Sequence, residues 1–109
     1  MKKSRLNRRV AVLKLKGRLD TIAIQSLKNK IGSLMDSNQI RIVLDMEQID
    51  FIDSAGLGGL ASAYRAVSET GGEIKIASLQ KQIEAIFELA RMHQLFEIFD
   101  DPISAAESF

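Results

Sequence analysis

The sequence predicts an α/β domain with a small, largely parallel sheet, and two observations lead to this fold class. Short apolar runs at residues 9–16, 40–44 and 73–77 alternate with longer segments whose apolar residues recur every three or four positions. Strands that alternate with helices favour a sheet whose strands are joined by right-handed helical crossovers. The length of 109 residues suits a single domain, 1–109, with one modest core.

The first half of the chain predicts two strands joined by one helix. Residues 9–16 partly alternate between two faces, as a strand does, and Gly17 is expected to end this strand. Asp20 or Thr21 is expected to cap a helix that closes at residues 36–38. Residues 40–44 are mostly apolar, which is typical of a strand covered on both faces. The helix between the strands carries its apolar residues at Ile24, Leu27, Ile31 and Leu34.

The second half predicts three further helices and two strands. Ser54 is expected to be the N-cap of a helix that stops at Gly71-Gly72, where a left-handed glycine would cap its end. A strand over 73–77, a helix from Gln80 to about Met92, a short strand over 95–99 and a final helix from Asp101-Pro102 follow. The inward residues of the two longer helices are expected to be Leu57, Leu60, Ala61, Tyr64 and Val67, then Ile83, Ile86, Phe87 and Ala90.

Composition excludes several classes of function. The chain has no cysteine, so it forms no disulfide and offers no thiolate to a metal. No apolar run approaches the length of about 18 residues that spans a bilayer, and no apolar segment follows the basic start as in a secretory signal. These features predict a cytoplasmic protein with no membrane partner.

The charges are distributed unevenly along the chain. Residues 1–18 hold eight basic residues and no acidic one, whereas the remainder holds seven basic and 14 acidic residues. Such a segment can attract nucleic acid, an anionic membrane or an acidic protein face. A solvated first strand after a frayed basic start at residues 1–8 is the plainer interpretation. No aromatic residues are interleaved for base stacking, so direct nucleic-acid binding is not expected.

The most informative segment is residues 49–60, which follow the apolar strand at 40–44. Ser54 stands between the acid Asp53 and a glycine-rich run, where the carboxyl end of a strand would expose its hydroxyl. Each glycine inside a helix costs about 0.5–1 kcal/mol relative to alanine, so the run indicates a close approach by the sheet or by a partner. The motif as a whole reads Asp53-Ser54-Ala55-Gly56-Leu57-Gly58.

This motif resembles the phosphoacceptor motif of the anti-sigma factor antagonists, the stand-alone bacterial STAS domains. Their motif runs Asp-Ser-(Ser or Ala)-Gly-Leu-Gly, and the resemblance extends over essentially the whole chain. A second match is Gly17-Arg18-Leu19-Asp20, where related proteins carry Gly-Glu-Leu-Asp or similar. Arg18 therefore departs from a position that is often acidic. The resemblance implies a small mixed, mostly parallel sheet with helices mainly on one side.

The resemblance also implies a function without catalysis or a resident cofactor. Unphosphorylated protein would bind an anti-sigma factor that is also a serine kinase, and so release a sigma factor for transcription. The kinase, with its own ATP and Mg²⁺, would phosphorylate Ser54, and a PP2C-type phosphatase would reverse the reaction. A monomer is sufficient for this switch. The partner face would comprise Asp20, Asp53, Gly56, Leu57 and Gly58, with Ala55 and Gly59 as weaker members.

Simple electrostatics predicts how phosphorylation of Ser54 would act. A phosphate there would lie over the positive end of a helix dipole, which stabilises an anion. The phosphate would also add about −1.5 to −2 charge to a surface that already holds Asp53 and is expected to hold Asp50 and Glu47. The expected outcome is a folded domain whose partner is repelled. Asp53 could orient the hydroxyl or only assist the helix start, because a kinase normally supplies its own base. Asp20 could likewise be only a helix cap.

Other chemistry receives little support from the sequence. A hydrolase elbow needs glycine where Ile52 stands, and His93 is the single histidine. There is no phosphate-binding loop of the Gly-x-x-x-x-Gly-Lys type, and the acidic residues Asp45, Glu47, Asp50 and Asp53 lack companion metal ligands. The main alternative is a STAS domain that is never phosphorylated and serves as an accessory or docking subunit of a transporter or signalling complex.

Overall fold

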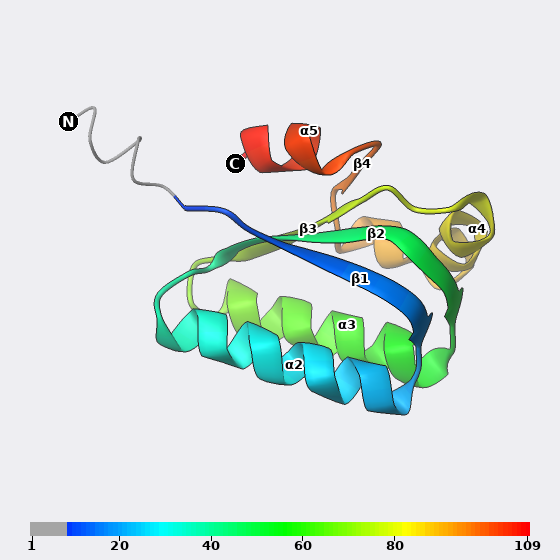
Figure 1. Ribbon diagram of the computed structural model, residues 1–109, viewed down its shortest axis with the longest axis horizontal. Helices are drawn as coiled ribbons and strands as arrows, with labels where there is room; N and C mark the ends of the chain where they lie inside the picture. The colour runs from blue at the N-terminus through cyan, green and yellow to red at the C-terminus, as the bar shows by residue number, and fades with distance from the viewer. Residues whose placement is uncertain (1–8) are drawn as a thin grey trace.

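The structure is a computed structural model that describes residues 9–109, so the expected frayed start at residues 1–8 lies outside the described residues. Within residues 9–109, four strands, four helices and one short 3-10 helix follow one another (Figure 1). The elements are β1 (Ala11–Leu19), α2 (Thr21–Asp36), β2 (Arg41–Ile52), α3 (Ser54–Ser68), β3 (Glu73–Ala77), α4 (Lys81–Leu89), η1 (Met92–Gln94), β4 (Ile98–Phe99) and α5 (Pro102–Glu107).

The four strands form one sheet in the order β1-β2-β3-β4, and each neighbouring pair is parallel. The expected α/β fold with a small sheet is confirmed, but the sheet of the described residues is parallel throughout rather than mixed. Each connection contains a helix that carries the chain back to the same end of the sheet, which is the route that parallel neighbours require. The carboxyl ends of all four strands therefore lie on one edge.

Helices cover both faces of the sheet, unequally. The long helices α2 and α3 lie side by side on one face, and the short helix α5 lies on the other (Figure 1). The main core is the layer between the sheet and the two long helices, as the expectation of helices mainly on one side requires. Its fully buried side chains include Ile42, Leu44, Met46, Ile49, Leu60, Val67, Ile74, Ile76, Ile83 and Phe87.

The first two strands are longer than the sequence indicates. β1 continues through Gly17, which has a φ of +85° and marks an irregularity in the ladder rather than the end of the strand. β2 continues past Leu44 to Ile52, and its pairing with β1 shifts register twice. Backbone pairing to β1 holds this polar extension in the strand, whereas an apolar pattern reveals only the covered part.

The segment after β3 also differs from its expected boundaries. α4 ends at Leu89, because Arg91 adopts a left-handed conformation with a φ of +60°, which starts η1. Ala90, expected to face inward, is exposed just beyond the helix. The last strand is only Ile98–Phe99 instead of residues 95–99. β3 has its expected bounds, and only its last two residues, Ile76 and Ala77, pair with β4.

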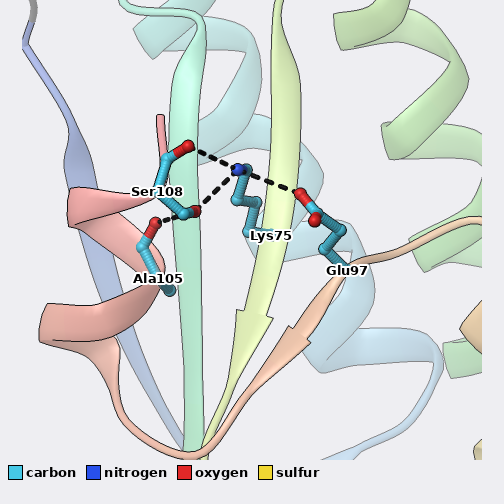
Figure 2. A network of polar contacts seen from close by, with 4 residues as sticks. All are labelled: Lys75, Glu97, Ala105 and Ser108. Carbon is cyan, nitrogen blue, oxygen red and sulfur yellow. Dashed lines mark hydrogen bonds and ion pairs between the residues drawn. The ribbon is translucent and has the colours of Figure 1, made fainter.

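A buried lysine fixes α5 to its face of the sheet. Lys75 on β3 is 4% exposed, and its Nζ donates to the side-chain oxygen of Ser108 at 2.7 Å. The same nitrogen lies 3.0 Å from a carboxylate oxygen of Glu97 (Figure 2). It also lies 4.4 Å from the ring centre of Phe109. A buried ammonium group needs such partners, so the ion pair and hydrogen bonds tie the two ends of the β4–α5 segment to the sheet.

Candidate functional site at the carboxyl ends of β1 and β2

Two aspartates begin the two long helices at neighbouring points of the sheet. Leu19, the last residue of β1, pairs with Ile52, the last residue of β2. Asp20 and Asp53 follow these paired residues directly, so the starts of α2 and α3 lie next to each other. The side chain of Asp20 accepts the backbone N–H of Ala23 at 3.1 Å, which confirms Asp20 as the helix cap.

Asp53, and not Ser54, is the N-cap of α3. Oδ1 of Asp53 accepts the backbone N–H of Gly56 at 2.9 Å, and the backbone of Asp53 is extended, with φ −111° and ψ −174°. Ser54 is already the first helical residue, so the prediction of Ser54 as the cap is wrong. Both residue types are good caps, and the carboxylate one position earlier takes the place that the serine was expected to fill.

Because Asp53 makes the cap, the hydroxyl of Ser54 takes no part in the hydrogen bonds of the helix start. Its side chain is exposed, and no hydrogen bond to the hydroxyl is present within residues 9–109. The first N–H groups of a helix have no partner inside the helix, and they carry the positive end of its dipole. A phosphate on Ser54 would therefore lie beside an environment that stabilises negative charge.

The three glycines of the motif have different surroundings. A Cβ atom on Gly56 would collide with the carbonyl oxygen of Leu19, and one on Gly59 would collide with the side chain of Ile24. These two glycines let α3 pack closely against β1 and α2. Gly58 has open space where a Cβ would stand and is exposed. The expected close approach by the sheet is confirmed for Gly56, whereas Gly59 packs against helix α2.

The expected partner face is thus only partly at the surface. Gly56 is buried and Leu57 is half-buried against the core, so these two residues position α3 and expose little surface of their own. Ser54, Ala55 and Gly58 are exposed, and Asp20 and Asp53 are half-buried beside them. The surface that remains is one hydroxyl with small neighbours and two capping carboxylates.

One exposed residue near these caps was not predicted from the sequence. Ile22 lies in the first turn of α2, two residues after Asp20, and is 81% exposed. The sequence does indicate the exposure of Ile22, because this residue falls outside the spacing of Ile24, Leu27 and Ile31, which form the buried face of the helix. An isoleucine in that position offers an apolar contact at the same edge of the sheet as Ser54.

The charges around the site are mixed. Glu47 and Asp50 are exposed on the last part of β2, as expected. Arg18 adds a positive charge at the end of β1, where its guanidinium carbon lies 3.9 Å from the ring centre of Phe51. That ring holds Arg18 by a cation–π contact. A partner therefore meets both signs of charge at this edge.

The residues around Ser54 are separate from the histidine and from any metal-binding group. Within residues 9–109, no group of three or more histidine, aspartate or glutamate side chains could hold a metal ion. His93 shares a pocket with Glu84, Phe87 and Glu88, and none of the residues around Ser54 lines that pocket. Fold and site together define a small binding domain whose helix start presents a hydroxyl.

Comparison with known proteins gives the family. The family model described as STAS domain matches residues 2–105, so the chain belongs to the STAS domain family. The family includes the anti-sigma factor antagonists and is one of non-enzymatic binding domains. The resemblance noted in the sequence is confirmed at this level. Distant homologues named as anti-sigma factor antagonists cover most of the chain.

Individual relatives are distant. An "anti-sigma F factor antagonist" of Paenibacillus polymyxa is 23% identical over 100 residues, which is 91% of this chain and 86% of the relative. The Bacillus protein SpoIIAA in its phosphorylated form has a TM-score of 0.72 at 19% identity, covering 94% of this chain and 93% of that one. A SulP transporter STAS domain from Vibrio cholerae has a TM-score of 0.73 at 17% identity, covering 91% and 79%. These structures establish a shared fold.

No helix within residues 9–109 is both long enough and apolar enough to cross a bilayer.

Proposed function

We propose that this STAS domain is an anti-sigma factor antagonist that is switched by phosphorylation of Ser54. Unphosphorylated protein binds an anti-sigma factor that is also a serine kinase, and a sigma factor is released. The observation that carries this proposal is the position of Ser54, whose exposed hydroxyl is free because Asp53 makes the cap. A serine that capped the helix itself would have to break a structural hydrogen bond to react.

The proposed switch is an ordinary phosphoryl transfer. The kinase, with ATP and Mg²⁺ in its own site, transfers the γ-phosphoryl group to Oγ of Ser54; the hydroxyl loses its proton and ADP leaves. A PP2C-type phosphatase cleaves the new phosphate ester with water, which restores the hydroxyl and releases inorganic phosphate. Asp53 is engaged with the N–H of Gly56, so its part is to hold the helix start in place and not to act as base.

The surroundings of Ser54 support release of the partner without unfolding. The added charge of about −1.5 to −2 would stand beside Asp53, and it would repel an acidic or closely fitted partner. The start of α3 favours the same charge, so the helix stays formed. Gly58 leaves open space in which a partner can approach Ser54. Asp20 and Ile22 extend this face onto α2.

The names of relatives support the same proposal. A relative of similar fold, SpoIIAA, is described as an anti-sigma factor antagonist and has been solved in unphosphorylated and phosphorylated forms. Its fold therefore tolerates the modification. The Paenibacillus polymyxa relative is described as an antagonist of anti-sigma F factor. By this likeness, we place an anti-sigma factor among the partners of this chain.

Binding measurements on three variants test the proposal. Each candidate anti-sigma factor kinase encoded in the same genome would be titrated with wild-type protein, Ser54→Ala and Ser54→Asp by calorimetry. We expect wild type and Ser54→Ala to bind one such kinase, and Ser54→Asp to bind at least about tenfold more weakly. Addition of ATP and Mg²⁺ should release wild type and leave Ser54→Ala bound. Equal binding of all three variants would contradict the switch.

A second candidate function is a constitutive docking subunit. The transporter STAS domain from Vibrio cholerae matches this fold as well as the phosphorylated antagonist does, with TM-scores of 0.73 and 0.72. In that case the surface around Ser54 would be a permanent interface. Its partner affinity would not depend on kinase or phosphatase treatment, which separates the two candidates.

A further inference from the structure

The last part of β2, residues 46–52, leads directly to the Ser54 motif and is paired with a strand on one side only. β1 pairs with β2 as far as Ile52, whereas β3 pairs only with residues 41–45. Within residues 9–109 no strand continues the ladder on the β3 side of this part of β2. In Figure 1 it bends towards the start of α3 and passes beside α4. Its position on that side therefore depends on contacts other than a second ladder.

A bulge lies at the beginning of this part of β2. Between its pairs at Asp45 and Gln48, β2 contains one residue more than the facing part of β1. An extra residue interrupts the ladder, so its backbone groups need other partners. The N–H of Glu47 donates to Oδ1 of Asp45 at 3.2 Å, and its carbonyl oxygen accepts a hydrogen bond from Nε2 of Gln80 at 2.8 Å. Side chains thus serve both backbone groups of Glu47.

Gln80 joins two segments that are distant in the sequence. It stands just before α4 and lies 33 positions after Glu47 along the chain. Because a carbonyl oxygen only accepts hydrogen bonds, the amide nitrogen of Gln80 must face Glu47. The amide oxygen of Gln80 accepts a hydrogen bond from Nε2 of Gln82 at 2.7 Å, so the first turn of α4 fixes the orientation of the amide. The side chain of Gln80 therefore ties the start of α4 to the bulge of β2.

The same residue occupies the N-cap position of α4 without capping the helix through its side chain. The other three helices within residues 9–109, α2, α3 and α5, are each preceded by an aspartate whose carboxylate accepts a backbone N–H. Gln80 has the extended backbone of an N-cap, with φ −68° and ψ 154°, but its side chain makes no cap hydrogen bond. Short polar side chains are the preferred caps, and glutamine is not one of them. At this helix the bond to Glu47 takes the place of a cap.

We propose that Gln80 is a positioning residue for the Ser54 switch. By binding the carbonyl oxygen of Glu47, it holds the last part of β2, and with it Asp53 and Ser54, in a fixed place beside α4. The inference rests on the proposed function, because a hydroxyl must be presented in one geometry to react efficiently in the site of a kinase. A residue that departs from the local preference of its helix is expected where function requires the departure.

The variant Gln80→Asn separates positioning from stability in the full chain, because asparagine is a good cap but is one methylene group too short to keep the bond. We expect a melting temperature equal to or above that of wild type, while amide exchange of residues 46–53 quickens relative to that of α2. With a candidate anti-sigma factor kinase, ATP and Mg²⁺, kcat for Ser54 should fall at least about fivefold and KM should change less than about twofold. The control Gln94→Asn, at an exposed position, should leave kcat and this exchange unchanged.

Several outcomes would overturn the inference. Unchanged exchange of residues 46–53 in Gln80→Asn would show that the bond does not hold β2. A lower melting temperature with faster exchange throughout the chain would assign Gln80 a purely structural role. Modification of wild type and Gln80→Asn at the same rate would overturn the role of Gln80 alone, whereas failure of every candidate kinase to modify wild type would overturn the proposed function together with that role. Gln80→Glu, which has the same length but no donor at neutral pH, replaces Gln80→Asn if circular dichroism shows that variant to be unfolded.

Discussion

The carboxylate of Asp53 accepts a hydrogen bond from the backbone N–H of Gly56 at 2.9 Å. Because this bond caps α3, the hydroxyl of Ser54 is not needed to hold the start of the helix. Asp53 carries the capping role, and the neighbouring Ser54 is left with an exposed hydroxyl. A kinase can modify that hydroxyl without removing any bond that holds α3 in place. The division of roles between two adjacent residues explains how one domain can keep its fold in both states of a switch.

The first prediction follows from this division of roles. Asp53→Ala should lower the free energy of unfolding by about 1 kcal/mol, because it removes the cap of α3. Ser54→Ala should change it by less than about 0.5 kcal/mol, because the substitution breaks no hydrogen bond. Urea denaturation followed by circular dichroism measures both values. A larger loss for Ser54→Ala than for Asp53→Ala would show that serine is the cap after all.

Replacing the two glycines that flank Leu57 with alanine should change the stability of the protein in opposite directions. Gly56→Ala should destabilise the protein by about 1–3 kcal/mol, because the new Cβ would collide with the carbonyl oxygen of Leu19. Gly58→Ala should stabilise the protein by up to about 1 kcal/mol, because it replaces an exposed helical glycine with open space around it. Thermal denaturation of the two variants shows whether each melting temperature is lower or higher than that of the wild type. Similar effects in both variants would contradict the different packing of these glycines.

Gly58→Ala also separates stability from binding. The added methyl group stands on the surface that the partner is proposed to approach, so partner affinity should fall while stability rises. Calorimetric titration with the cognate kinase provides the affinity. A variant that is more stable and binds as well as wild type would place the interface away from Gly58.

A negative charge at position 54 should leave the fold intact. In Ser54→Asp the carboxylate stands in the first turn of α3, where the helix dipole favours it, so the free energy of unfolding should change by less than about 1 kcal/mol. Amide exchange and chemical shifts should show α3 still formed. Loss of α3 in this variant would indicate a switch that works by unfolding instead of by repulsion at the interface.

The anchoring of α5 gives a prediction on the opposite face of the sheet. Lys75→Ala should lower the free energy of unfolding by about 2 kcal/mol, because it removes a charged hydrogen bond to Ser108 and the buried part of the side chain. Amide exchange in residues 102–108 should quicken more than exchange in α2. The matched change Lys81→Ala, at an exposed position, should have almost no effect. Unchanged exchange in α5 would contradict the anchoring role.

The start of α5 should depend on pH. Hydrogen bonds from the backbone N–H and the hydroxyl of Ser104 lower the pKa of Asp101 below its ordinary value of 3.8. A lowered pKa in the folded state means that this cap contributes stability above pH 3.8, which is lost as the pH falls through the folded value. Exchange of the α5 amides should quicken in that acidic range. The Asp101→Asn variant should remove this dependence.

The order of the elements was predictable from periodicity, because the apolar residues of each helix and strand face one shared core. Asp20 as a cap and Pro102 at the start of α5 were predictable from residue type. The full length of β2 was not, because residues 45–52 hold several polar side chains, and their strand conformation depends on pairing with β1. Pairing between segments distant in sequence leaves no local pattern.

The site shows the same distinction. That Ser54 stands at a helix start could be predicted, but the choice between two adjacent capping residues depends on backbone geometry. The glycine run indicated close packing, whereas the collisions at Gly56 and Gly59 depend on where Leu19 and Ile24 lie in three dimensions. Ile22 could have been found as an apolar residue outside the helical spacing.

The most direct test of the central proposal is the intact mass of the protein purified from its native cells, with any phosphosite mapped by fragmentation. We predict that, in at least one growth or stress condition, a fraction of the chains carries one phosphate group and that this group lies on Ser54. The same samples should lose the added mass on treatment with a PP2C-type phosphatase. A chain that stays unmodified in every condition, or carries its phosphate elsewhere, would contradict the switch and favour a constitutive docking subunit.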